Sequence, residues 1–162
     1  MAIQKWLMFI LLGCCAQLTW SGKIQGSVLR VNDGDTLTIL TKNKLWLKVR
    51  LLEIDAPERG QAFGNKSKQS LARVCAKQQA TVFFDKQDKY GRILGRVFCN
   101  KIDANRWQVA QGMAWVYDQY VNDHSLYQLQ KKARDKKIGL WRDKKPTAPW
   151  VYRHNSPRHF YH

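Results

Sequence analysis

The sequence predicts a mixed α+β domain, mainly β, in which a five-stranded barrel carries about three helices. Apolar runs rich in Val, Ile and Leu recur along the chain, and segments with helical spacing lie between and after them. The connections contain Gly, Asn or Asp, which favour turns. Short strands with inserted and appended helices are typical of a small closed barrel of the OB type.

The five strands are each predicted from a short apolar run. The turn Thr41 to Lys44 separates the second run from the third, and the loop Asp85 to Gly91 joins the last two. The runs are Ser27 to Val31, Thr36 to Leu40, Leu45 to Ile54, Thr81 to Phe84 and Ile93 to Cys99.

The helices are predicted from apolar stripes and end signals. A stripe of Leu71, Val74 and Cys75 indicates a helix over 65–77. Asp103 or Asn105 can cap a short helix through Val109, and a last helix is expected from Ser125 to Lys137, closed by Gly139. The stretch from Trp141 to Trp150 contains two prolines, so we expect it to be extended.

Residues 1–21 have the pattern of a secretory signal, because Lys5 precedes a short apolar run followed by small residues. We therefore expect an exported protein, secreted or periplasmic, with a domain over 22–153 and a polar His-containing tail over 154–162. The run Leu11-Leu12-Gly13-Cys14 also resembles a bacterial lipobox. In that alternative Cys14 is lipidated and anchors the protein to a membrane.

The formal net charge of +16 favours polyanionic partners such as nucleic acid, anionic membrane or acidic glycans, and charge does not choose among them. Only Cys75 and Cys99 remain after the leader. In an oxidising compartment such a pair suggests one disulfide, and two inert buried thiols are the alternative.

Acidic residues are concentrated in one part of the sequence. Of the 12 Asp and Glu residues, five are Asp33, Asp35, Glu53, Asp55 and Glu58. Asp35 should open one strand and Asp55 should end another, so neighbouring strand ends can place both carboxylates around one hard cation. Arg50 adds a planar cation suited to a phosphate oxygen, and Glu58 can reach a nearby water. Phosphodiester hydrolysis needs such groups.

Three motifs carry a resemblance to a known family. They are DGDT at 33–36, RLLEIDAPE at 50–58 and DKYGR at 88–92. Together they closely resemble the staphylococcal-nuclease-like (thermonuclease) family, from about Gly22 to about Arg153. The resemblance implies an OB-type barrel and a Ca²⁺-dependent nuclease that cuts DNA and RNA with little sequence preference, leaving 3′-phosphate ends. DNA and RNA are then the expected substrates of a monomer with no obligate protein partner.

The resemblance also implies roles for individual residues. Calcium would be held by Asp35 and Asp55 through their side chains and by Ala56 through its carbonyl, where the type member has a hydroxyl residue. Arg50 and Arg92 would clamp the scissile phosphate. Glu58 would act as general base, although a role in ordering water alone is compatible with the sequence.

Three further residues are expected to bind nucleic acid. Lys89 and Tyr90 precede Arg92 in its loop and offer a charge and a stacking face to neighbouring nucleotides. Tyr120 is assigned to the family's base pocket, with Tyr117 as the competing choice and Trp115 expected in the core.

Two other function classes remain as alternatives. A non-catalytic OB-fold nucleic-acid-binding protein would have no need for this set of carboxylates and arginines together. A cationic adhesion or membrane-active protein would act without metal and ignore nucleic acid. Histidine-driven hydrolysis is disfavoured because only His124 lies within the expected domain.

Overall fold

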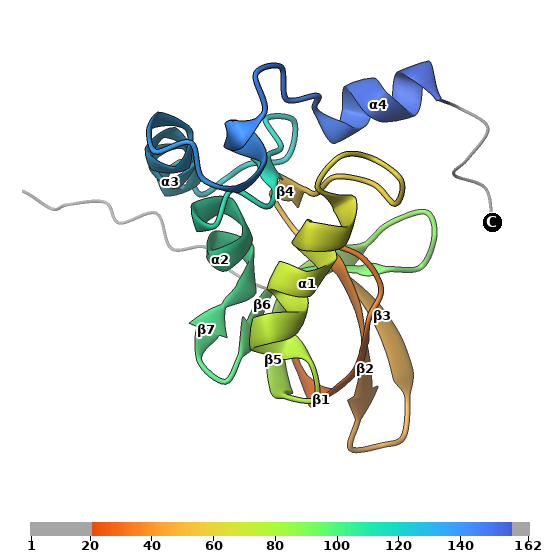
Figure 1. The fold of residues 1–162 in the computed structure, drawn as a ribbon. Coiled ribbons are helices and arrows are strands. Elements are labelled where there is room, and N and C mark those ends of the chain that lie inside the picture. Colours follow the sequence, from red (N-terminus) through yellow and green to blue (C-terminus); the bar gives the residue numbers. More distant parts are fainter. Residues whose placement is uncertain (1–20, 157–162) are drawn as a thin grey trace, which may run out of the picture.

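Five strands form a mixed sheet that closes into a barrel in the computed structural model, which describes residues 21–156 (Figure 1). The sheet order is β3-β2-β1-β5-β6, and β3 also pairs with β6 to close it. This confirms the predicted fold class. The strands are β1 Gly22–Val31, β2 Thr36–Thr41, β3 Trp46–Leu51, β5 Gln79–Gln87 and β6 Ile93–Cys99.

The closing pair β3–β6 is parallel and positions one functional segment. Val49 pairs with Ile93 and Arg50 pairs with Leu94. Arg92 therefore enters the barrel wall one residue before this pairing begins, beside the strand that carries Arg50. Two motifs far apart in the sequence are brought together by barrel closure.

The expected third strand, Leu45 to Ile54, is divided into β3 and the short β4, Ile54–Asp55. The division falls at Glu53, whose φ is 68°, a left-handed conformation that ends an extended strand. β4 leaves the barrel sheet and pairs instead with β8, Trp115–Val116. This turn directs the DAPE segment toward the C-terminal half of the chain.

The helices cover one side and one end of the barrel, as Figure 1 shows. Asp103 is the N-cap of α2, where its side chain accepts a hydrogen bond from the Arg106 N–H at 3.0 Å. A short strand, β7 Ile102–Asp103, pairs with β6 before this helix. The helices are α1 Gly64–Cys75, α2 Ala104–Ala110, α3 Ser125–Asp135, the 3₁₀ helix η1 Gly139–Arg142 and α4 Pro149–Asn155.

The expectation of an extended chain from Trp141 to Trp150 is wrong. η1 runs through Arg142, and α4 begins at Pro149. Proline is well tolerated at the first helical position because its missing N–H would have no intrahelical partner there. The Trp150 ring, one residue later, packs edge-on against Trp115 with 5.7 Å between ring centroids, which fixes the new helix against the domain.

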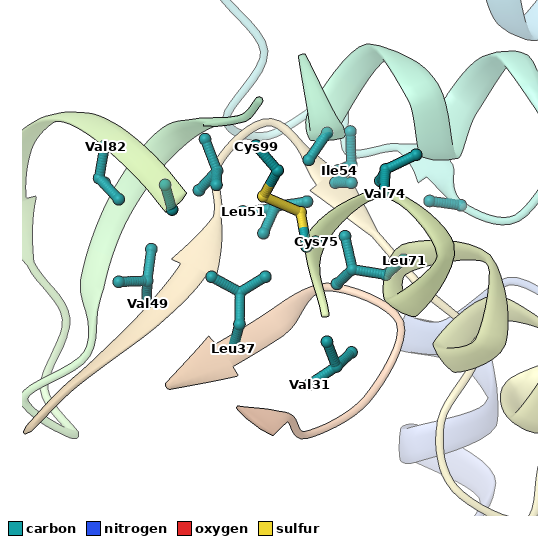
Figure 2. Close-up of a cluster of buried hydrophobic side chains, with 14 of the residues drawn as sticks. Val31, Leu37, Val49, Leu51, Ile54, Leu71, Val74, Cys75, Val82 and Cys99 are labelled. Carbon is teal, nitrogen blue, oxygen red and sulfur yellow. A yellow bond between two sulfur atoms is a disulfide. The ribbon is translucent and has the colours of Figure 1, made fainter. Parts of the chain in front are cut away.

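The main core lies between the barrel and α1 (Figure 2). Leu37, Val49 and Leu71 are fully buried there. A disulfide joins Cys75 at the end of α1 to Cys99 at the end of β6, with their Cα atoms 5.1 Å apart. It links the C-terminal end of α1 to the barrel wall.

No helix within residues 21–156 is both long and apolar enough to cross a lipid bilayer. The leader and the possible lipobox at Cys14 lie outside the described residues, as do the last residues of the predicted tail.

Replacing both cysteines by alanine should lower the free energy of unfolding. The two cysteines lie 24 residues apart, and their disulfide restricts the unfolded chain. Without it the unfolded state gains conformational entropy, and the free energy of unfolding falls by roughly 3 kcal/mol. Urea denaturation followed by circular dichroism measures the change. A double variant within 0.5 kcal/mol of the oxidised parent would contradict this stabilising role.

Candidate functional site

The turn between β1 and β2 is held in one conformation from several sides. Asp33 Oδ1 accepts the Asp35 N–H at 3.0 Å, and the buried Gln108 donates its Nε2 to the Gly34 carbonyl at 2.6 Å. A side chain at Gly34 would overlap Ser67 Oγ and the Ala56 side chain, so only glycine fits between the turn and α1. The turn therefore presents Asp35, which is 7% exposed, at a fixed place.

Arg50 joins the two aspartates that were expected to meet. Its Nη1 lies 3.3 Å from Asp35 Oδ2, and its Nη2 lies 2.7 Å from Asp55 Oδ1. The same Nη1 donates to the Ile54 carbonyl at 3.1 Å. Ala56 completes the connection by donating its backbone N–H to Asp35 Oδ2 at 2.9 Å. The structure thus brings Asp35, Asp55, Ala56 and Arg50 into one buried cluster.

Burial dominates the electrostatics of this cluster. Burial raises the pKa of Asp55 above its usual range, and hydrogen bonding from Arg153 and the charge of Arg50 only partly oppose that rise. Burial also raises the pKa of Asp33 to about 7, with the Asp35 charge adding to it. Burial would lower the pKa of Arg50, but the charges of Asp35 and Asp55 outweigh it and raise this pKa.

Glu58 lies at the more open side of the cluster, where it meets an arginine from the C-terminal helix. Arg153 Nη1 lies 2.6 Å from Glu58 Oε1, and Arg153 Nη2 lies 2.8 Å from Asp55 Oδ2. The carbonyl of Glu58 also packs so closely on Gly64 that a side chain at Gly64 would overlap it. Glu58 is therefore held beside Asp55 by α1 on one side and by α4 on the other.

Arg92 sits in a loop organised by Asp88. Asp88 Oδ1 accepts the N–H groups of Tyr90 at 2.9 Å and Arg92 at 3.0 Å, and its Oδ2 lies 2.7 Å from Arg92 Nε. These hydrogen bonds lower the pKa of Asp88 although its burial works the other way. Tyr90 is 66% exposed, and Lys89 Nζ lies 5.1 Å from its ring centroid. In this structure Arg92 forms its ion pair with Asp88, beside the strand that holds Arg50.

The two candidate tyrosines are close together. Their rings meet edge-on at 5.0 Å, and Tyr120 is 45% exposed. One face of Tyr117 is stacked on Trp150 at 5.4 Å, with an interplanar angle of 6°. Trp115 packs edge-on against Trp141 at 4.5 Å in the smaller cluster under α3. Tyr120 thus keeps an accessible ring, while Tyr117 is partly covered by α4.

Glu53 has a structural role, although the sequence groups it with the other four acids. It is 4% exposed, and its Oε1 accepts the N–H groups of Asn122 at 2.6 Å and Asp123 at 2.7 Å. Its own carbonyl accepts the Tyr117 N–H at 2.9 Å. Glu53 therefore ties the bend after β3 to the segment that carries the tyrosines.

Sequence reasoning missed three residues of this region: Gln61, Gln108 and Arg153. Gln61 accepts the Glu58 N–H at 3.0 Å and donates to the Thr147 carbonyl at 2.7 Å, so it joins two distant loops. Uncharged amides and a lone arginine near the C-terminus carry no local pattern that indicates these contacts. Only Pro149, as a possible first residue of a helix, signals that Arg153 belongs to a folded element.

The donor set suits a hard divalent cation, because Asp35 and Asp55 offer buried carboxylate oxygens. Within residues 21–156 no group of three or more His, Cys, Asp and Glu side chains is arranged around a common metal position. A cation here would hence rely on two carboxylates, a carbonyl such as that of Ala56, and water, which calcium tolerates.

Fold and site together define a class: a small OB-type barrel with a buried carboxylate and guanidinium cluster where β2 and β3 meet β4. Residues 48–143 match the family model described as staphylococcal nuclease homologue. The chain belongs to this family.

Several curated proteins are similar over most of their length. A protein of Escherichia coli called an uncharacterized endonuclease is 42% identical over 132 residues, which cover 81% of this chain and 86% of that protein. A Haemophilus influenzae protein of the same name is 42% identical over 147 residues, or 91% and 80% of the two chains. The micrococcal nuclease of Shigella flexneri is 38% identical over 143 residues, 82% of each.

Replacing Glu53 by glutamine should destabilise the fold by roughly 1.5–3 kcal/mol, because the N–H groups of Asn122 and Asp123 lose a buried, charged acceptor. Thermal and urea denaturation measure this loss. Asp135→Asn, on the exposed end of α3, is the control and should leave stability within about 0.5 kcal/mol. Equal stability of the Glu53→Gln variant and the parent would remove Glu53 from this structural role.

Proposed function

We propose that the protein is an exported, calcium-dependent endonuclease that hydrolyses phosphodiester bonds of DNA and RNA with little sequence preference and leaves 3′-phosphate ends. One observation carries the proposal: Arg50 joins the carboxylates of Asp35 and Asp55, with Glu58 beside them. Relatives named endonuclease and micrococcal nuclease support the reaction class.

The chain's own groups suit each part of the hydrolysis. Arg50 and Arg92 bind nonbridging oxygens of the scissile phosphate, where negative charge accumulates in the transition state. Bound calcium would polarise a phosphate oxygen. Reaching the phosphate requires Arg92 to exchange its ion pair with Asp88 for one with the substrate. Asp88 would keep its two backbone N–H partners in such an exchange, so these hydrogen bonds would still hold the loop.

Glu58 is placed to activate the attacking water. It accepts a proton from the water as the oxygen bonds to phosphorus, the P–O5′ bond breaks, and the departing O5′ takes a proton from solvent. Arg153 occupies Glu58 Oε1 in this structure, so a water that uses this oxygen must displace the guanidinium. Lys89, Tyr90 and Tyr120 lie on exposed loops and serve neighbouring phosphates and bases.

The formal charge of +16 supports a polyanionic substrate, since clustered lysines and arginines attract nucleic acid over long range. The Cys75–Cys99 disulfide supports export, because such bonds persist in oxidising compartments. Secretion or periplasmic release follows from the leader, and anchoring through Cys14 is the alternative route.

Glu58→Gln should lower cleavage of single-stranded DNA by roughly a hundred- to ten-thousandfold, because it removes the proton acceptor. A calcium chelator should abolish cleavage by the parent. Asp135→Asn is the matched charge control and should cut at the parental rate. Chelator-resistant cleavage excludes the metal-dependent reaction, and binding without cleavage favours a non-catalytic nucleic-acid-binding barrel.

Arg92→Lys should lower kcat by roughly a hundredfold while calcium affinity stays the same, since lysine cannot form two parallel hydrogen bonds to a phosphate. Steady-state kinetics and a calcium titration measure the two quantities. Arg30→Lys, on an exposed part of β1, is the control. An unchanged kcat would show that Arg92 does not contact the scissile phosphate.

A further inference from the structure

The C-terminal helix α4 places two different groups over the site from one face. Trp150 and Arg153 are three residues apart, so their side chains emerge on the same side of the helix. Trp150 stacks on Tyr117, and Arg153 contacts Asp55 and Glu58. Figure 1 shows α4 in blue next to the yellow loop that follows β4. One short helix therefore contacts both the acidic side chains and the ring of Tyr117.

Arg153 engages the oxygens that a divalent cation would need. Its Nη1 and Nη2 donate to Asp55 Oδ1 at 3.2 Å and Oδ2 at 2.8 Å. Arg50 donates to Asp55 Oδ1 as well, at 2.7 Å. Both oxygens of this carboxylate are thus occupied by guanidinium groups. A cation and Arg153 compete for Asp55, because the two positive charges repel each other at that distance.

Trp150 covers one face of Tyr117, the competing candidate for stacking on a base. Its ring lies parallel to that of Tyr117, with 5.4 Å between the ring centroids. Flat stacking on a tyrosine is also how single-stranded nucleic acid is commonly bound. While α4 is in place, this face of Tyr117 is not available to a base.

The attachment of α4 to the domain is suited to a movement of this helix away from the site. Gln61 connects the Glu58 loop to Thr147 just before the helix, so the helix stays tethered when it moves. A cavity of about 200 Å³ borders the helix at Tyr152 and is also lined by Pro57 and Phe63. A helix of 7 residues is too short to be stable alone, so its contacts with the domain maintain it.

We propose that α4 is a built-in cap of the site, in which Arg153 takes the place of the cation and Trp150 takes the place of a base. Calcium and nucleic acid then bind by displacing the cap. The apparent calcium affinity is then the affinity of the open form multiplied by the fraction of molecules in which the cap is open. By linkage, calcium must also favour the open cap. The inference rests on the proposed function, since it assumes a calcium site at Asp55.

Calcium titration calorimetry of the mature chain tests the cap without relying on nuclease activity. Arg153→Gln should bind calcium about tenfold more tightly than the parent. Trp150→Ala should shift affinity in the same direction, because it loosens the same helix. Arg142→Gln, an exposed arginine of η1, is the matched control and should bind like the parent. Circular dichroism establishes that each variant is folded.

Hydrogen exchange of the α4 amides is the second readout. Calcium should speed exchange in residues 150–155 of the parent, and it should have less effect in Arg153→Gln. Calcium binding by Arg153→Gln that equals the parent's overturns the cap. Weaker binding also overturns it and shows that Arg153 orders the carboxylates instead. If neither chain binds calcium, the proposed metal site fails together with the cap; calcium-dependent cleavage with equal affinities refutes the cap alone.

Discussion

The central constraint of this structure is the burial of two carboxylates that share one guanidinium. Asp55 is 1% exposed, and its negative charge is tolerable there only because Arg50 and Arg153 surround it. Removing one partner of such a buried pair typically costs about 3–5 kcal/mol. The bend at Glu53, the tight turn at Gly34 and the closing of β3 on β6 all serve to bring these charges together.

The same constraint connects stability with function. Buried carboxylates need cationic partners, and α4 supplies one in Arg153, which pairs with both Asp55 and Glu58. Glu58 then has two possible partners, Arg153 or a water molecule. The C-terminal helix therefore contacts the candidate site directly, although Arg153 lies 95 residues from Glu58 along the chain.

Much of the barrel could be predicted because each strand corresponds to an apolar run between turn residues in the local sequence. β6 has the expected bounds, and α1 and α3 differ from expectation only by a few residues at their ends. The bend at Glu53 could not be predicted, because it depends on N–H groups supplied by Asn122 and Asp123. α4 was missed for a similar reason: its stacking partners, Trp115 and Tyr117, lie more than thirty residues earlier.

The sequence by itself determined the strand pattern, the excess of positive charge and the identity of the acidic and basic residues available for chemistry, because these are properties of local residue order. Only the tertiary structure decided that Glu53 supports the fold, that Arg92 rests on Asp88, and that Arg153 reaches Asp55. Ion pairs form between whichever charges the folded backbone brings within a few ångströms, and that proximity depends on barrel closure rather than on any motif.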